Sequence, residues 1–359
     1  MGLKAMQIAM LKKAVHLTFA AALLAGASTF AALTPAAAAE VTKLAILTPE
    51  EATDYGWNQQ GFEAAQAVAE KYGLEFLPAT GLGYGDVRPV LRELAADGAS
   101  LMLAHASGYN TAAPEIAEET GVPVAIVDVP DGNRSGLVAD YTLSGHEGAY
   151  LAGMLAARMS TTGKIGIVVS GEPPSWNSQS AAFAQGAKAA KADIEIVYAV
   201  IGLAAYSDAA GGRRVTETVI GAGADVVFGQ GDGATFGMLQ AAETTKAVNG
   251  SKVWFIDVIG DKTPIDKGHL LSSVVWNMEP VYTAMIEDLK AGTYGTHGYQ
   301  IALADDSVQL LKTPHIPEDI WGELMKVRDQ IVQGSLSVEP IWDAEAVRAL
   351  MTSTTINED

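Results

Sequence analysis

Cysteine is absent from the 359 residues of this chain. Its absence excludes disulfide bridges, thiolate metal sites and thiol nucleophiles. Bacterial lipoproteins carry their lipid on a cysteine directly after the cleavage site of the leader. If the chain is exported, we therefore expect it to be released and not lipidated.

Basic residues are also scarce, with 23 Lys and Arg against 42 Asp and Glu. Three of the lysines and none of the acids lie before residue 40, so the rest of the chain has 20 basic residues and a net charge of −22. Binding to nucleic acid or anionic lipid depends on neutralising phosphates with Lys and Arg. A surface of this charge repels both, and we expect no nucleic-acid partner.

A long apolar run occurs only near the N-terminus. Two lysines at 12–13 precede the apolar run 14–33, and alanines at 37–39 follow it. A basic segment, an apolar segment and an A-x-A site in this order are typical of a cleaved signal peptide. A membrane anchor is the alternative, but no basic stop-transfer cluster follows the run. We predict a signal peptide over residues 1–39 and a soluble protein in the periplasm of a Gram-negative cell.

Signatures of catalysis and of metal binding are missing as well. His146 and Glu147 are not followed by the second histidine that a zinc protease places at helical spacing, and no G-x-S-x-G elbow occurs. The segment 229–233 (GQGDG), with Asp257 farther along, suggests a dinucleotide-binding loop. Its spacing is G-x-G-x-G, however, and glycine-rich turns are common after parallel strands. We predict no catalytic residue, no metal and no cofactor.

Short apolar runs alternate with amphipathic segments along the rest of the chain. Ten runs are apolar on both faces, as in a parallel sheet covered by helices, at 44–47, 75–79, 101–104, 122–127, 137–139, 165–169, 194–200, 226–229, 253–259 and 270–275. Alanine-rich stretches with helical spacing lie between them, at 61–72, 87–96, 111–119, 144–159, 178–190, 213–221, 235–245 and 280–291. This order predicts an α/β fold with doubly wound parallel sheets.

The length predicts two Rossmann-like lobes, because roughly 320 residues after the leader exceed what one core usually supports. We expect the N-terminal lobe over 40–160, with 268–296 returning to it. We expect the C-terminal lobe over 161–267, with 297–350 returning to it, and a tail over 351–359. Ligands of such sheets bind beyond the carboxyl ends of the strands, so a cleft between the lobes is the expected site.

The segment 54–61 (DYGWNQQG) resembles the opening of the basic membrane protein family of ABC-importer substrate-binding proteins. Further matches, in the order of the family, are HEG at 146–148, YSD at 206–208, GDG at 231–233, and Asn277 with Pro280 and Tyr282. The resemblance covers nearly all of the chain after the leader. It implies a type I periplasmic-binding fold with three crossings between lobes, and a flat-ringed ligand in the cleft.

The resemblance assigns roles to single residues. It places Trp57 as the stacking aromatic, Asp54 and Asn58 as its polar neighbours, and Trp176 as an aromatic of the second lobe. On the residues alone, Trp57 could equally fill the core, Asp54 could cap a helix, and a lone histidine such as His105 is more often structural.

One departure from the family concerns the ribose. Nucleoside receptors of the family hold it with an Asp and a Lys, and at the matching positions this chain has Ile259 and Trp276. A bare purine base, or another small planar solute, is therefore as readily expected as a nucleoside.

Together these features predict a periplasmic solute-binding component of an ABC importer that binds a purine base or a nucleoside-like ligand. The expected partners are the small-molecule ligand and the ABC permease of the inner membrane, and a monomer is expected. A sugar receptor is an alternative, as is a periplasmic hydrolase or NAD-dependent oxidoreductase. The candidate ligand-binding residues are Asp54, Trp57, Asn58, His105, Ser107, Tyr109, Trp176, Tyr206, Asp232, Asp257, Trp276 and Asn277.

Overall fold

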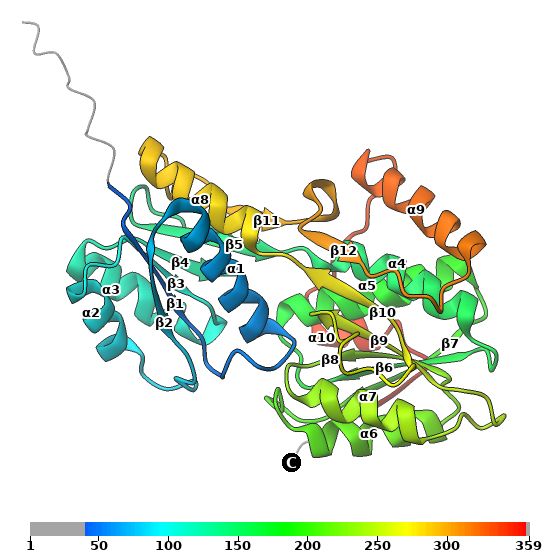
Figure 1. Cartoon of the computed structure of the whole chain (residues 1–359). Helices are drawn as coiled ribbons and strands as arrows, with labels where there is room; N and C mark the ends of the chain where they lie inside the picture. The colour runs from blue at the N-terminus through cyan, green and yellow to red at the C-terminus, as the bar shows by residue number, and fades with distance from the viewer. Residues whose placement is uncertain (1–39, 357–359) are drawn as a thin grey trace, which may run out of the picture. The chain divides into compact units, whose positions relative to one another are not determined.

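The computed structural model describes residues 40–356 (Figure 1). The signal peptide predicted over residues 1–39 lies outside the described residues, as do residues 357–359. The described chain is built on two sheets, each covered by helices on both faces, and the predicted α/β fold with two lobes is confirmed. Within residues 40–356, no helix combines the length and the apolar content needed to cross a membrane.

The first sheet has six parallel strands in the order β11-β5-β4-β3-β1-β2. Their bounds are β1 Lys43–Leu47, β2 Glu75–Ala79, β3 Leu101–Ala104, β4 Val124–Val127, β5 Val138–Leu143 and β11 Tyr299–Ile301. One face is covered by α1 (Trp57–Tyr72) and α8 (Glu279–Ala291), and the other by α2 (Arg88–Ala96) and α3 (Ala112–Thr120). Side chains alternate between these faces: Leu44 and Ile46 of β1 pack with the first pair of helices, and Leu47 with the second.

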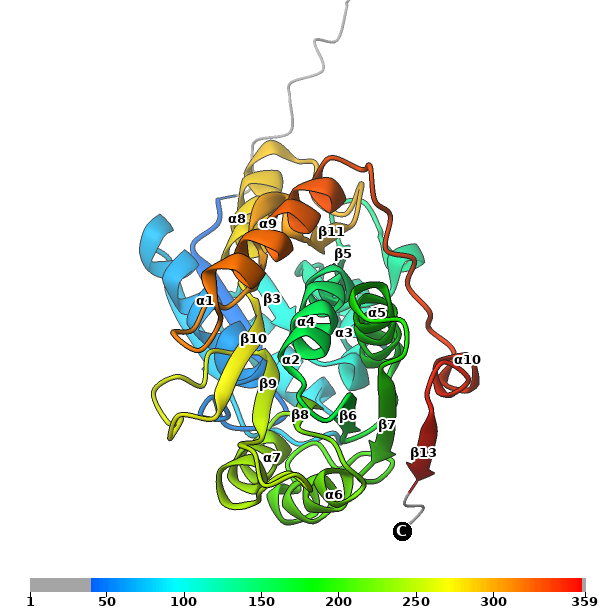
Figure 2. The same ribbon diagram turned by 90° about the vertical axis from the view of Figure 1, so that its right-hand side faces the viewer.

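The second sheet has seven strands in the order β12-β10-β9-β8-β6-β7-β13, and only the pairing of β12 with β10 is antiparallel. Their bounds are β6 Lys164–Val169, β7 Glu195–Val200, β8 Val226–Gln230, β9 Trp254–Ile259, β10 Leu270–Trp276, β12 Val308–Leu310 and β13 Ser353–Ile356. The helices α4 (Gly145–Met159) and α5 (Pro174–Ala190) lie on one face, and α6 (Ala209–Gly221) and α7 (Ala234–Thr244) on the other (Figure 2). We call the first sheet with its four helices the first lobe, and the second sheet with its helices the second lobe.

Shorter elements complete the lobes. They are α9 (Glu318–Val332), α10 (Ala344–Arg348) and the 3₁₀ turns η1 (Ser107–Tyr109), η2 (Pro130–Gly132) and η3 (Leu303–Asp305). The chain passes between the lobes three times: from β5 into α4, from β10 into α8, and from β11 into β12. Leu143 ends β5 and Trp276 ends β10, so both residues lie where the chain enters a crossing.

The lobe boundaries expected from the sequence differ from the structure at four places. The expected first lobe runs to residue 160, but α4 packs on the second sheet. The expected tail over 351–359 contains β13, which pairs with β7 of the second sheet. The predicted return over 268–296 includes β10, but β10 pairs with β9 and β12 of the second sheet, so the return begins with α8. The predicted return over 297–350 includes β11, which pairs with β5 of the first sheet. An apolar run predicts a buried strand, but it carries no information on which of two sheets accepts the strand.

Glycine allows α4 and α5 to pack with their backbones in contact. A Cβ on Gly153 of α4 would lie 1.9 Å from the carbonyl oxygen of Phe183, and a Cβ on Gly186 of α5 would lie 1.9 Å from that of Tyr150. Real atoms cannot approach so closely, so the helices would have to separate. These two glycines therefore fix the spacing of the helix pair that covers the second sheet.

We predict that Gly153→Ala lowers the free energy of unfolding by about 3 kcal/mol, because overpacking at a backbone contact forces the two helices apart. Urea unfolding at neutral pH measures this. The matched control is Gly221→Ala in α6, where an added Cβ meets nothing within 4 Å. The control should change stability by no more than about 1 kcal/mol, in the stabilising direction. Equal stability of the two variants would contradict the packing argument.

Candidate functional site

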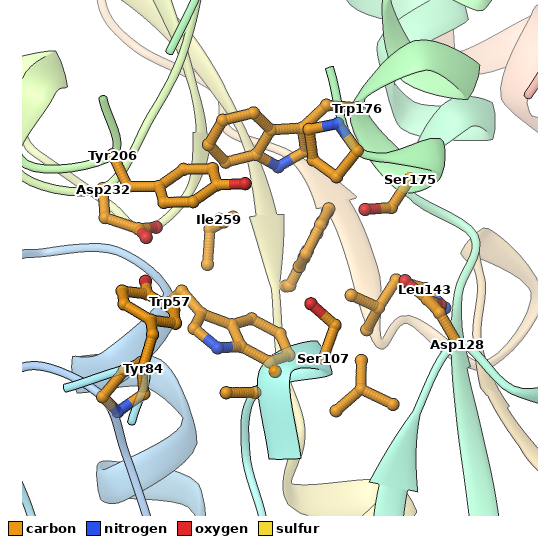
Figure 3. Close-up of a pocket in the computed structure, with 16 residues that line it drawn as sticks. Trp57, Tyr84, Ser107, Asp128, Leu143, Ser175, Trp176, Tyr206, Asp232 and Ile259 are labelled. Atoms are coloured by element: carbon orange, nitrogen blue, oxygen red, sulfur yellow. The ribbon is translucent and has the colours of Figure 1, made fainter. Parts of the chain in front are cut away.

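A cavity of about 210 Å³ lies where the strands of both sheets end (Figure 3). From the first lobe it is lined by Pro49, Trp57, Tyr84, Ala106, Ser107, Gly108, Val127 and Asp128. From the second lobe it is lined by Pro173, Ser175, Trp176, Tyr206, Asp232 and Ile259. Leu143 and Trp276 complete the wall at two of the crossings. These residues lie at or beyond the carboxyl ends of parallel strands, which is where open α/β sheets bind ligands.

Trp57, the first residue of α1, is supported from behind by His105. The two rings are stacked, with centroids 3.6 Å apart and planes 9° apart. The indole Nε1 of Trp57 donates a hydrogen bond to the carbonyl oxygen of His105 at 2.9 Å. Gly61 makes room for this arrangement, because a Cβ there would lie 2.2 Å from Nε2 of His105. With one face held by His105, the Trp57 ring lines the cavity as a fixed flat surface.

His105 itself is buried and serves as a neutral platform. Its Nε2 faces the carbonyl oxygen of Trp57 at 2.9 Å, and because a carbonyl only accepts, Nε2 carries the proton. Its Nδ1 then accepts from the hydroxyl of Tyr141 at 2.6 Å and lies 2.9 Å from that of Tyr282. Burial lowers the pKa of His105 from 6.5 to about 3. His105 thus contacts Trp57 and does not line the cavity.

Asp54 and Asn58 hold the start of α1 in place. The Asp54 carboxylate accepts from the backbone N–H groups of Gly56, Asn58 and Gln59 at 2.9–3.0 Å, and from the Asn58 side chain at 2.7 Å. The Asn58 amide oxygen accepts from the backbone N–H of Glu50 at 3.3 Å. Both side chains are buried and are used by the protein itself. They fix the position of Trp57 and do not line the cavity.

Three further candidate residues lie behind or beside the cavity. The Tyr109 hydroxyl donates to the carbonyl oxygen of Gly83 at 2.7 Å and so holds the loop that carries Tyr84. Asp257 is fully buried in an ion pair with Lys262. Asn277 is exposed and accepts from the backbone N–H of Glu279 at the start of α8.

The structure thus divides the twelve candidates into two groups. Those that line the cavity are Trp57, Ser107, Trp176, Tyr206, Asp232 and Trp276. Those that do not are Asp54, Asn58, His105, Tyr109, Asp257 and Asn277. Sequence reasoning overlooked Tyr84, Asp128 and Ser175. Asp128 could have been found, because it directly follows β4 just as His105 follows β3.

Two carboxyl groups lie on opposite sides of the cavity (Figure 3). Asp128 accepts from the backbone N–H of Leu143 at 2.9 Å, and burial raises its pKa to about 7. Burial, reinforced by Asp54 and Glu50, raises the pKa of Asp232 well above its usual range. Of the described residues that line the cavity, none is Lys, Arg or His. The site therefore offers acceptors and hydroxyls but no cation.

Within residues 40–356, no group of three His, Asp or Glu side chains is arranged to hold a metal ion. Some of the buried polar groups around the cavity are satisfied by backbone groups, as at Asp54 and Asp128, whereas Oδ1 of Asp232 and the indole Nε1 of Trp276 are buried without a hydrogen-bond partner. This arrangement suits a ligand that stacks and donates hydrogen bonds.

Comparison with protein families matches residues 41–340 to the Bmp family, described as PnrA-like ABC transporter substrate-binding proteins. The chain is 22% identical over 265 residues to the transcriptional activator protein med of Bacillus subtilis, a match that covers 73% of the chain and 80% of that protein. It is 33% identical over 135 residues to the ABC transporter nucleoside-binding protein BmpA of Lactococcus lactis, covering 36% of the chain and 37% of that protein. A solved structure of an ABC transporter solute-binding protein from Aeropyrum pernix superposes with a TM-score of 0.74 at 17% identity. The match covers 86% of this chain and 96% of that chain. At this identity the superposition shows the fold alone.

We predict that acid removes the stability contributed by His105. The folded protein holds the ring neutral while the unfolded chain protonates it, so the contribution is complete above pH 6.5 and is lost as the pH falls toward 3. We compare the free energy of unfolding of the wild type with that of His105→Gln. The wild-type value minus the variant value should fall by about 2 kcal/mol when the pH is lowered from about 7.5 to about 5. Urea unfolding at both values measures it. A difference that stays constant would mean that the ring is not held neutral.

Proposed function

The chain belongs to the PnrA-like family of ABC transporter substrate-binding proteins, and we propose that its ligand is a small planar solute of the purine type. Members of this family bind a substrate for a transporter and do not convert it. The observation that carries the ligand class is the Trp57 ring, fixed on His105 and presented to the cavity. We further propose that Trp57, Ser107, Trp176, Tyr206, Asp232 and Trp276 contact the ligand, together with Asp128 and Ser175.

Aromatic side chains on both lobes favour a flat ligand. Trp176 and Tyr206 of the second lobe lie across the space from Trp57 (Figure 3). They support each other edge to face, with ring centroids 5.3 Å apart. A ring between these surfaces would gain about 1–3 kcal/mol from stacking on Trp57. The cavity of about 210 Å³ is smaller than the roughly 300–1,000 Å³ of a typical drug-sized site, which favours a small ring.

The polar groups favour a ligand that donates hydrogen bonds. Asp128 and Asp232 can each accept an N–H from a ring or an amino group, and both ends of a purine carry such groups. Because the lining contains no Lys or Arg, a phosphate or carboxylate on the ligand would be buried without a counter-charge. An uncompensated buried charge is strongly unfavourable, so nucleotides are disfavoured.

The proposed cellular role follows from the family. We propose that the predicted signal peptide directs the mature protein to the periplasm, where it would act as a monomer and carry its ligand to an ABC permease of the inner membrane. The relative from Lactococcus lactis whose name specifies nucleoside binding supports a ligand with the flat ring of a nucleobase.

We predict that Trp57→Ala weakens purine binding about thirty- to more than a hundredfold, corresponding to about 2–3 kcal/mol of lost stacking. Trp57→Phe should weaken it only mildly, because a smaller flat ring remains. Calorimetric titration with adenine, guanine and hypoxanthine measures the affinities. Trp321→Ala in α9, outside the cavity lining, is the control and should bind as the wild type does. A Trp57→Ala protein that melts early yet binds normally at low temperature would contradict the proposed role.

We predict that a free base binds at least as tightly as its nucleoside. Trp276 and Ile259 present apolar surface to the cavity, and each sugar hydroxyl buried there without a partner would cost about 1–3 kcal/mol. Titration of adenine against adenosine, and of hypoxanthine against inosine, tests this. A clear preference for the nucleosides would show that the hydroxyls find partners, for example on Ser175 or Asp128.

A further inference from the structure

The turn over residues 54–57, which leads into α1, lies against the second lobe. The carbonyl oxygen of Tyr55 accepts a hydrogen bond from Nζ of Lys262 at 3.1 Å. The same oxygen rests on Gly260, where an added Cβ would lie 1.8 Å from it. Tyr55 has a φ of 49°, a left-handed conformation that is uncommon outside glycine and that turns the chain sharply at this contact.

The next two residues of the turn also meet the second lobe. A Cβ on Gly56 would lie 3.6 Å from the Cα of Asp232, so the two backbones are close. The backbone N–H of Trp57 partly counteracts the rise in the pKa of the Asp232 carboxyl that burial causes. The Tyr55 ring meets Phe236 edge to face, with centroids 6.2 Å apart. The turn therefore contacts four residues of the second lobe. We call these residues the socket: Asp232, Phe236, Gly260 and Lys262.

Lys262 supplies the positive charge of this socket. Its side chain is fully buried and pairs with Asp257, which is also fully buried. Its charge also acts on Asp232, whose carboxyl lies near the acids Asp54 and Glu50 of the first lobe. Lys262 does not line the cavity. Its hydrogen bond to Tyr55 joins residues of different lobes and would be lost if the lobes separated.

The loop that carries Lys262 is shaped for this contact. Ile259, at the end of β9, has a φ of 71°, which is strongly disfavoured for a β-branched residue. Strain of this kind persists only where the surrounding structure imposes it, and it is concentrated at functional segments. In this loop, the conformation of Ile259 brings Gly260 into contact with the carbonyl oxygen of Tyr55. It also brings Lys262 within hydrogen-bond distance of that oxygen.

From these contacts we infer that Lys262 and Gly260 are positioning residues that set ligand affinity without touching the ligand. They hold the turn 54–57, and with it Trp57, against the second lobe when the lobes are closed around the cavity. Contacts made only in the closed state increase its population, and the apparent dissociation constant is inversely proportional to the closed fraction. The inference rests on the proposed function only for the choice of purine as the probe.

The experiment uses the mature full chain and follows purine release. Lys262→Met removes the ammonium and keeps most of the stem, and Gly260→Ala blocks the Tyr55 oxygen while leaving the ion pair intact. Lys252→Met is the matched control, because its Nζ also donates to a backbone carbonyl, that of Gly268 at 2.6 Å, but within the second lobe. Stopped-flow fluorescence with the tightest-binding purine base gives the association and release rates.

We expect Lys262→Met and Gly260→Ala to speed release by about tenfold or more with little change in association, and Lys252→Met to behave as the wild type. The readout separates positioning from folding, because lost fold would reduce the amount of binding-competent protein and not the release rate of what remains. Wild-type release from both variants would overturn the inference. The inference would also be overturned if only Lys262→Met released purine faster and this variant also had a lower melting temperature. That result would reflect only the unpaired Asp257.

A second readout needs no ligand. Because the chain has no cysteine, Ala67→Cys on α1 and Val248→Cys after α7 introduce two exposed labelling sites, one on each lobe. Energy transfer between dyes at these sites should report a larger open population in ligand-free Lys262→Met and Gly260→Ala than in the same labelled protein without them. An unchanged population would overturn the inference. If no purine binds the wild type, the proposed ligand class fails, and this measurement still decides the role of Lys262.

Discussion

In both lobes, parallel pairing brings the carboxyl ends of the strands to one edge, and the residues that follow the strands meet around a single cavity. β1, β3 and β4 deliver Pro49, Ser107 and Asp128 from one side, and β6, β8 and β9 deliver Ser175, Asp232 and Ile259 from the other. No long-range signal in the sequence is required to gather them, because the strand direction does so. What the sequence must still specify is how each side chain is held at that edge.

The hold on Trp57 is a chain of buried polar contacts. Asp54 uses its carboxylate on the first turn of α1, and His105 supports the indole while keeping its own ring neutral between Trp57 and Tyr141. These groups use their hydrogen-bonding capacity within the protein, so they are not available to bind the ligand. The flat surface is thus prepared before the ligand arrives, which reduces the ordering that binding would otherwise require.

Most of the fold could be predicted from the sequence, because ten strands are largely apolar and are separated by helical segments and turns. Three strands were missed. β11 and β12 each have three residues with an exposed residue in the middle, a pattern too short to stand out, and β13 is mostly Ser and Thr. Asp54 shows a different limit: the sequence could place it at a helix start but could not tell whether its oxygens would be used there or in the cleft. Lys262 left no signal, because its partner is the backbone oxygen of a residue 207 positions away.

Trp276 has two roles in the structure. Its ring closes one wall of the cavity, and it also lies against Gly145, where a Cβ would be 2.6 Å from the indole. Trp276 ends β10 and Gly145 begins α4, so this contact joins two of the three crossings on which the lobes turn. One side chain thus both closes a wall of the cavity and packs at the junction of the two lobes. A substitution at this one position would therefore alter the shape of the binding space and the joint between the lobes together.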